Sequence, residues 1–170
     1  MLHVIIGCMF SGKTSSLQET FTKFKSSKRV LVLDYDTTNS NTQYTSTLYT
    51  HSNLTTPCIK LMNLDIDFLS YDCILINEAQ FFKDLDRFVK QALLHKKDVY
   101  VYGLDGDFKQ EKFGFILDLI PFCDTLTKLY AKCKCGANAN FTKRLSVNET
   151  QYAPNDTYVP VCRSCLSDSF

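Results

Sequence analysis

The segment GCMFSGKT, at residues 7–14, constrains this chain more than any other. It follows an apolar run at residues 4–6 that predicts a strand, and it precedes residues 15–21, which predict the first turns of a helix. A strand, the pattern G-x-x-x-x-G-K-T and a helix, in this order, are the context of a phosphate-binding loop. The two glycines allow a backbone path that points N–H groups at phosphate oxygens, and the positive end of the helix dipole adds to the attraction. The alternative interpretation is a glycine turn that carries a surface lysine.

Two side chains of this segment have roles that the pattern predicts. The Lys13 ammonium would bridge the β- and γ-phosphates of ATP, and the Thr14 hydroxyl would be a ligand of Mg²⁺. We therefore expect the whole segment to bind ATP. Its members are Gly7, Cys8, Met9, Phe10, Ser11, Gly12, Lys13 and Thr14.

Composition narrows the class of protein. The chain has 170 residues, of which 45% are hydrophobic, so it can form one globular domain with a core and a small appendage. A formal net charge of +1 gives no basic field for nucleic acid, and no apolar run approaches the ~18 residues of a membrane span. The chain begins directly with a predicted core strand, without a visible signal or transit peptide. We therefore expect a cytoplasmic protein that acts on small molecules, with neither nucleic acid nor a membrane as its partner.

Apolar runs recur along the first two thirds of the chain. Those at residues 30–33, 73–76 and 99–102 predict strands that are buried on both faces, and residues 83–96 show the apolar spacing of a helix. Strands that alternate with helices predict an α/β fold, with a mostly parallel sheet, right-handed crossovers and helices on both faces.

One long segment lacks such a pattern. Residues 37–57 are dominated by Thr, Ser, Asn and Tyr, and we expect them to form a long mobile loop. A short strand is predicted directly after it, at residues 58–61.

Polar groups follow the ends of four predicted strands. Ligands of parallel sheets bind at the carboxyl ends of the strands, so we expect these groups to line one crevice. They are Gly7, the segment 34–36, the pair Asn77 and Glu78, and the segment 105–107.

The pair Asn77 and Glu78 ends the apolar run at residues 74–76. An apolar strand that ends in an acidic residue is typical of the second nucleotide-binding element, which holds Mg²⁺ directly or through water. Glu78 is the better candidate for a general base that takes a proton from an acceptor hydroxyl. The alternative is a carboxylate that only caps the next helix.

The eight cysteines indicate a metal site in a reducing compartment. Cys133 and Cys135 form one close pair, and Cys162 and Cys165 form another. Two such pairs predict one tetrahedral Zn²⁺ held by four thiolates, which would stabilise a unit too small to fold on its own core. Four reduced, unliganded cysteines are the alternative. The composition shifts near residue 123, so we place a nucleotide-binding core with the phosphate-binding loop at 1–122 and the zinc-binding unit at 123–170.

Aromatic residues are frequent in the loops that should flank the crevice, where they could enclose a nucleobase. Each of them, taken singly, would also fit ordinary core packing. They are Phe81, Phe82, Phe108, Phe113, Phe115 and Tyr158.

Five segments together resemble one family. IIGCMFSGKT, INEAQFF, GLDGDFKQEKFGFILDLIPF, CGANANFTKR and YVPVCRSC occur in the same order in the cellular and poxvirus-type (type II) thymidine kinases. The resemblance covers nearly the full length. It implies a RecA-like core with a zinc-bearing lasso domain, usually assembled as a homotetramer. It also implies transfer of the ATP γ-phosphate to the 5′-hydroxyl of thymidine, and of deoxyuridine, with dTTP as a candidate feedback nucleotide.

The resemblance also implies roles for single residues. Glu78 corresponds to the base that activates the 5′-hydroxyl, and Asp36 to the loop aspartate associated with the metal, so Mg²⁺ would be held by Thr14, Asp36 and Asn77. Tyr158 falls where the lasso closes over the nucleoside. The residues that would enclose the thymine ring are Met9, Phe81, Leu104, Phe108, Phe113 and Thr142.

Several positions depart from the family pattern. Asn77 stands where the family has Asp, which predicts weaker Mg²⁺ binding with activity retained. Ala153 and Pro154 replace two glycines of the lasso, and because proline fixes φ, they predict a stiffer opening. The first cysteine pair is one residue short. Two other functions stay open. One is a deoxynucleoside kinase with another base preference, which the size of the pocket around Met9, Leu104 and Thr142 would decide. The other is a nucleotide-binding module with a zinc ribbon that lacks kinase activity, and Asn77 is the feature that supports it.

Overall fold

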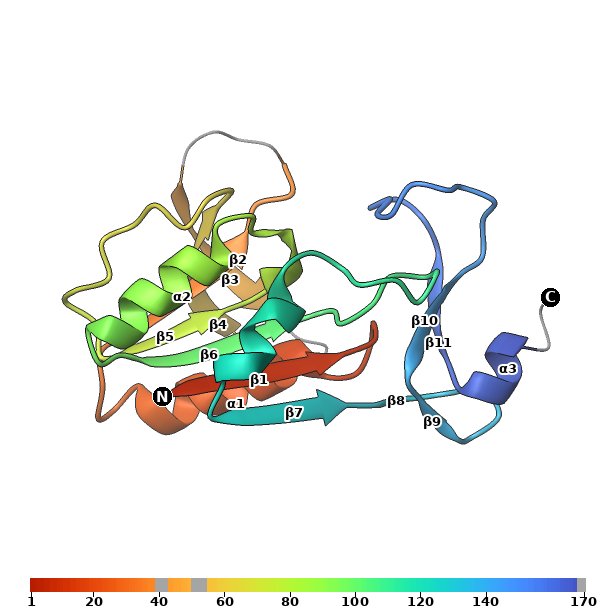
Figure 1. The fold of residues 1–170 in the computed structure, drawn as a ribbon, viewed down its shortest axis with the longest axis horizontal. Coiled ribbons are helices and arrows are strands. Elements are labelled where there is room, and N and C mark those ends of the chain that lie inside the picture. Colours follow the sequence, from red (N-terminus) through yellow and green to blue (C-terminus); the bar gives the residue numbers. More distant parts are fainter. Residues whose placement is uncertain (39–42, 50–54, 168–170) are drawn as a thin grey trace.

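The computed structural model of this protein describes residues 1–38, 43–49 and 55–167. A large sheet with helices packed on it forms one part of the molecule (Figure 1). A smaller part with short strands and one short helix lies beyond one end of that sheet, and the strand β7 leads into it (Figure 1).

The large sheet has seven strands in the order β3-β4-β2-β5-β6-β1-β7. The strands are β1 (Leu2–Gly7), β2 (Val30–Tyr35), β3 (Tyr44–Tyr49), β4 (Thr55–Leu61), β5 (Cys73–Ile76), β6 (Asp98–Gly103) and β7 (Thr125–Leu129). All neighbouring pairs are parallel except β3 with β4, which are antiparallel. The central strand β5 is buried along its whole length, as a continuous apolar run between two helical layers requires.

Helices cover both faces of the sheet, as predicted. The helix α1 (Lys13–Phe24) buries Leu17 on one face. The helix α2 (Leu85–Leu94), a short 3₁₀ helix η1 (Ala79–Phe81) and a second one, η2 (Ile116–Phe122), pack on the other. The apolar residues of α2 recur at helical spacing and are buried, which is why this segment forms a helix against the sheet. The α/β fold with a mostly parallel sheet is therefore confirmed.

The prediction of one long loop at residues 37–57 is wrong for the described part of that segment. β3 and the first residues of β4 are instead paired as antiparallel strands, with β3 at the edge of the sheet. Thr and Tyr favour strands, and an edge strand can leave one face in solvent, so a polar sequence can still form a strand here. Residues 39–42 and 50–54 of the predicted loop lie outside the described residues.

The smaller part consists of two two-stranded sheets and one helix. These are β8 (Ala131–Lys132) with β9 (Asn138–Ala139), β10 (Phe141–Arg144) with β11 (Tyr158–Val161), and α3 (Arg163–Ser167). The large sheet extends past residue 122, where we expected the core to end, because β7 pairs in parallel with β1. The sequence pattern did not predict α3.

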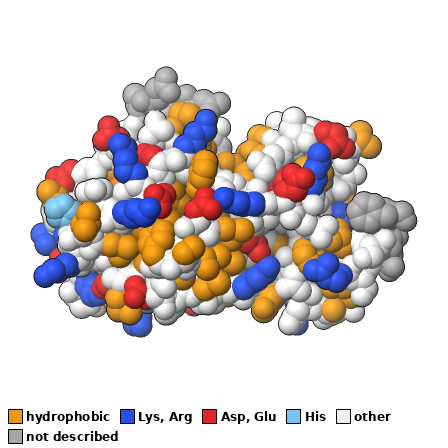
Figure 2. Space-filling model, in the orientation of Figure 1, with side chains coloured by type: hydrophobic (Ala, Val, Ile, Leu, Met, Phe, Trp, Pro, Cys, Tyr) orange, Lys and Arg blue, Asp and Glu red, His pale blue; other side chains and the backbone are white. Residues whose placement is uncertain are grey.

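The surface carries mixed charge. Lys and Arg side chains alternate with Asp and Glu side chains over the face drawn in Figure 2. Among the helices in the described ranges, none combines the length and the apolar composition that crossing a bilayer needs.

Candidate active site

The segment 7–14 forms the predicted loop between β1 and α1. Gly12 takes up a left-handed conformation with φ of 85°, which a glycine adopts without strain. A Cβ atom on Gly7 would lie 2.5 Å from the carbonyl oxygen of Leu129, so a larger residue would push the loop away from β7. The Lys13 ammonium donates to the carbonyl oxygens of Gly7 at 3.0 Å and Cys8 at 2.7 Å. Burial lowers the pKa of Lys13, and the negative charge of Glu78 opposes that shift.

A cleft of about 810 Å³ opens beside this loop. It lies at the carboxyl ends of β1, β2 and β5, where ligands of parallel sheets bind. Its lining combines residues of the loop, residues at the ends of strands and several aromatic rings. The residues that line it are Met9, Phe10, Ser11, Gly12, Lys13, Thr14, Ser15, Asp34, Tyr35, Thr37, Tyr49, Lys60, Asn77, Glu78, Gln80, Phe81, Leu104 and Tyr152.

Glu78 is held in an unusual conformation at the end of β5. Its backbone is left-handed, with φ of 50° and ψ of 39°, which is uncommon for a residue with a side chain and clusters at functional sites. The amide nitrogen of Gln80 donates to the Glu78 carboxylate at 2.6 Å, and the backbone N–H of Leu104 donates to the Gln80 carbonyl oxygen at 3.0 Å. Gln80 therefore fixes the Glu78 carboxylate in the cleft, a role that sequence analysis missed.

The backbone of Gln80 packs so closely against Gly114 that only a glycine fits at position 114. Gly114 has φ of 60°, and a Cβ atom there would lie 1.8 Å from the backbone oxygen of Gln80. The segment around Gly114, which follows β6 in the chain, therefore packs directly against the turn that carries Glu78.

Aromatic rings form the wall of the cleft next to Glu78. The ring of Phe81 stacks on Tyr35 at a centroid distance of 5.0 Å and meets Phe113 and Tyr152 edge to face at 5.3 and 4.8 Å. Burial raises the pKa of Tyr152, and the Glu78 charge adds to that rise. Such a wall can enclose a flat ring beside a carboxylate.

The four predicted zinc ligands come together in the smaller part. The sulfur atoms of Cys133, Cys135, Cys162 and Cys165 all lie within 4.8 Å of one another. Hydrogen bonds from the backbone at Cys135 and Cys162 lower the pKa of the Cys133 thiol to about 6. Contacts with the other three sulfurs raise the pKa of Cys165 to about 12. Four thiolates at one point fit a tetrahedral Zn²⁺.

Comparison with known proteins identifies the family. The family model described as thymidine kinase matches residues 1–166. The chain belongs to the thymidine kinase family. It is 39% identical to a thymidine kinase of Oryza sativa subsp. japonica over 98% of this chain and 66% of that protein. It is 34% identical to the thymidine kinase of vaccinia virus (strain Western Reserve) over 99% of this chain and 97% of that protein. The cytosolic thymidine kinase of Homo sapiens is 34% identical over 96% of this chain and 72% of that protein.

The cleft contains some, and not all, of the residues expected from the thymidine kinase resemblance. Met9, Phe81 and Leu104 line it. Phe113 lies behind Phe81, and Thr142 accepts a hydrogen bond of 3.0 Å from the backbone N–H of Met9. Three residues expected around the thymine ring, Phe108, Phe113 and Thr142, are absent from the lining of the cleft, and so is Tyr158, which was expected where the lasso closes over the nucleoside.

The expected metal ligands are likewise divided. Thr14 and Asn77 line the cleft, whereas Asp36 is fully buried outside it. One oxygen of the Asp36 carboxylate accepts hydrogen bonds from the backbone N–H and hydroxyl of Thr38, at 2.9 and 2.7 Å, and from the Tyr44 hydroxyl at 3.3 Å. In this structure Asp36 therefore holds its own loop against β3.

The segment 105–107 does not line the cleft with the other strand ends, contrary to our expectation. It borders a separate cavity of about 270 Å³. Asp105 forms an ion pair of 2.6 Å with Lys128, and Asp107 accepts hydrogen bonds from the backbone N–H groups of Lys109 and Glu111. Both carboxylates are held by residues outside the cleft, which the position at a strand end did not reveal.

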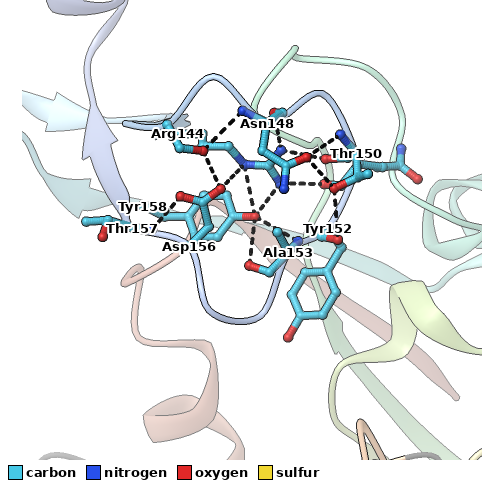
Figure 3. Close-up of polar contacts among 10 residues, drawn as sticks. Arg144, Asn148, Thr150, Tyr152, Ala153, Asp156, Thr157 and Tyr158 are labelled. Atoms are coloured by element: carbon cyan, nitrogen blue, oxygen red, sulfur yellow. Dashed lines mark hydrogen bonds and ion pairs between the residues drawn. The ribbon is translucent and has the colours of Figure 1, made fainter.

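The loop between β10 and β11 is organised around Arg144 (Figure 3). The side chain of Arg144 is 0% exposed. Its guanidinium donates to the carbonyl oxygens of Asn148 at 2.6 Å, Thr150 at 2.5 Å and Gln151 at 3.4 Å. Three carbonyls on one cation fix the course of the loop, since bonds to a charged donor are roughly twice as strong as neutral ones.

Further contacts complete this network. Arg144 pairs with Asp156 at 3.3 Å and donates to the hydroxyl of Tyr158, which in turn donates to the carbonyl oxygen of Ala153. The guanidinium also stacks on Phe108, 4.0 Å from the ring centroid. The Tyr152 side chain points out of the loop, away from Arg144 (Figure 3). Phe108 and Tyr158 thus support the loop, while Tyr152 reaches the cleft.

Substitution of Arg144 by methionine should disorder this loop. The change removes the only charge that the three carbonyls share in the described network and takes away the ion-pair partner of Asp156, so the folded protein should lose stability. We expect a lower melting temperature and faster proteolytic cleavage within residues 145–157. Arg87→Met is the matched control, because Arg87 is exposed on α2, and it should change neither. Equal protease sensitivity of the two variants would contradict the role of Arg144.

Proposed function

We propose that this protein transfers the γ-phosphate of ATP to the 5′-hydroxyl of thymidine, and also of deoxyuridine. Membership of the thymidine kinase family supports the proposal. The observation that carries it for this chain is the position of Glu78, a carboxylate held by Gln80 in the same cleft as the phosphate-binding loop and an aromatic wall.

The donor end of the cleft suits a nucleoside triphosphate. The N–H groups of the loop and the start of α1 would face the phosphate oxygens. Lys13, whose ammonium donates only to oxygens of its own loop among the described contacts, can turn from them to the β- and γ-phosphates. Oxygen donors for Mg²⁺ are present in the same cleft in Thr14, Asn77 and Asp34. Mg²⁺, when bound, would neutralise charge on the phosphates.

The acceptor end suits a nucleoside. We propose that Glu78 accepts the proton of the 5′-hydroxyl as that oxygen forms a bond to the γ-phosphorus. The bond between the γ-phosphorus and the bridging oxygen to the β-phosphate breaks, and ADP leaves with that electron pair. Phe81, Met9 and Leu104 would enclose the base and exclude water, which would otherwise compete as the acceptor.

We extend the proposal to the parts around this site. The smaller part would hold Zn²⁺ through Cys133, Cys135, Cys162 and Cys165, and its loop would close over the nucleoside. Because β7 belongs to the large sheet, we place the start of this lid unit after Leu129. A homotetramer, feedback binding of dTTP and a cytoplasmic location follow from the family resemblance, and a human relative carries the name cytosolic.

A panel of nucleosides tests the proposal. The full chain, loaded with zinc, is incubated with ATP, Mg²⁺ and each of thymidine, deoxyuridine, deoxycytidine, deoxyadenosine and deoxyguanosine. We expect phosphorylation of thymidine and deoxyuridine. Turnover of another nucleoside alone would indicate a kinase of different base preference.

A second outcome would overturn the proposal that this protein is a nucleoside kinase. No turnover of any nucleoside, by folded protein that still binds ATP, would indicate a nucleotide-binding module. Oligonucleotide binding with a steep salt dependence would then favour the zinc-ribbon alternative.

A further inference from the structure

Three polar side chains stand in one row across neighbouring strands at the floor of the cleft. Lys60 on β4 is the register partner of Asp34 on β2. Leu33 is paired with Ile76, so the next residue on each strand places Asp34 beside Asn77 at the end of β5. The Asn77 amide donates to one Asp34 oxygen at 2.8 Å, and the Lys60 ammonium contacts the other at 2.9 Å.

This row faces the helix that begins at the phosphate-binding loop. Side chains alternate between the faces of a strand. The residues two positions earlier on the three strands are Cys58, Val32 and Leu75, and all three pack in one cluster with Leu17 of α1. The row therefore points to the face that α1 covers, and it lines the same cleft as the first turn of that helix.

The row contains one of two carboxylates that line the cleft in the described chain. Glu78 is the other, and Gln80 and the aromatic wall hold it at the acceptor end. Asp36 lies outside the cleft and is bonded to Thr38 and Tyr44. Asp34 is thus the carboxylate that remains for the donor end.

We propose that Asp34 is the positioning residue for the cation that accompanies the triphosphate of ATP. This inference rests on the proposed function, because it takes ATP as the donor. Asp34 supplies, from the neighbouring strand, the negative charge that the neutral Asn77 does not carry. The Asn77 amide fixes the direction of the Asp34 carboxylate, and Lys60 balances its charge while the cleft is without nucleotide.

The same geometry predicts the effect of a carboxylate at position 77. Asn77→Asp alone would bring two carboxylates into contact at the position of a 2.8 Å hydrogen bond and would replace an attraction by a repulsion. The exchange variant, Asp34→Asn with Asn77→Asp, restores one amide and one carboxylate and keeps the charge of the row. The weaker Mg²⁺ binding that we predicted from Asn77 alone should therefore not be seen in the natural chain.

Nucleotide affinity with and without Mg²⁺ tests this inference without any turnover. Dissociation constants for ATP are measured by titration calorimetry in Mg²⁺ and in EDTA, and the ratio of the two is the readout. Mg²⁺ should raise the affinity of the natural chain for ATP. In Asp34→Asn we expect this gain to be smaller by ~10-fold or more, as is typical when a supporting carboxylate is lost. The exchange variant should recover most of that gain.

Controls separate this effect from misfolding. Asp72→Asn removes a carboxylate from an exposed ion pair with Arg29 and should leave the ratio unchanged. Melting temperatures should fall for Asn77→Asp and return toward the natural value in the exchange variant. If Asp34→Asn does not fold, the exchange variant still tests the inference. We expect its ratio of dissociation constants to be close to that of the natural chain, and loss of the Mg²⁺-dependent gain in this variant would overturn the inference. An unchanged ratio in folded Asp34→Asn also overturns it.

The experiment distinguishes this inference from the proposed function. A natural chain that binds ATP with a large Mg²⁺-dependent gain and phosphorylates no nucleoside would refute the kinase while leaving the role of Asp34 open to the same variants. A natural chain that phosphorylates thymidine, with Asp34→Asn unchanged in its binding ratio, would refute only the role of Asp34.

Discussion

Glu78→Gln should lower kcat for thymidine by about 10²–10⁴-fold, because glutamine cannot accept the proton of the 5′-hydroxyl. Glutamine has nearly the volume of glutamate and can keep a hydrogen bond to the Gln80 side chain by rotation of its own amide, so the fold should be retained. The measurement is the rate of thymidine phosphorylation at saturating ATP and Mg²⁺. Because the lost interaction develops in the transition state, kcat and kcat/KM should fall together.

Two controls make this result specific. Glu19→Gln removes a carboxylate from the exposed side of α1 and should leave the rate unchanged. The affinity of Glu78→Gln for ADP should equal that of the natural chain, because Glu78 lies at the acceptor end of the cleft. A rate near that of the natural chain would assign proton transfer to solvent or to another group and would leave Glu78 as a residue that only shapes the turn.

The parts of the site that could be predicted are those set by local sequence. A glycine-rich loop between a strand and a helix, and an apolar strand that ends at Glu78, are contained in short windows, and both are found where they were expected. The two cysteine pairs are also local, although their meeting depends on the β10 and β11 pairing between them.

The parts that could not be predicted depend on strand register. Asp34 and Lys60 meet because β2 and β4 are neighbours with a defined pairing, which no spacing along the chain encodes. Gln80 was overlooked because an uncharged side chain gives no signal until its two bonds are seen. Tyr152 was missed for a similar reason, since Arg144 decides where its loop runs.

The errors in the fold have a common cause. β3 was predicted as loop because a polar edge strand lacks the apolar pattern that marks the buried ones. The core was expected to end at residue 122, and yet β7, with exposed residues along most of its length, extends the sheet at its other edge. The two strands of the large sheet that were missed both lie at its edges, where a strand pairs with one neighbour and is only partly buried.

Removal of zinc should weaken ATP binding as well as unfold the smaller part. The smaller part, which carries the four-cysteine cluster, contacts the phosphate-binding loop directly. The Cys8 thiol donates to the carbonyl oxygen of Ala139 at 3.3 Å, and the backbone N–H of Met9 donates to the Thr142 hydroxyl at 3.0 Å. Cys8 also packs in one apolar cluster with Cys133 and Cys162. A unit this small would derive much of its folding free energy from a metal bound at the cluster, so we expect the loop to lose these supports without zinc.

The test compares zinc-loaded protein with Cys162→Ser and with protein treated with a zinc-selective chelator, in excess Mg²⁺. We expect a lower melting temperature, a loss of ATP affinity of about tenfold or more and a still larger loss of activity, with recovery when zinc is returned to the chelated chain. Cys123→Ser, at a cysteine outside the cluster, should change none of these. Zinc-free protein that keeps its ATP affinity while losing thymidine turnover would show that the smaller part serves only the acceptor end, and that its bonds to Cys8 and Met9 do not shape the phosphate-binding loop.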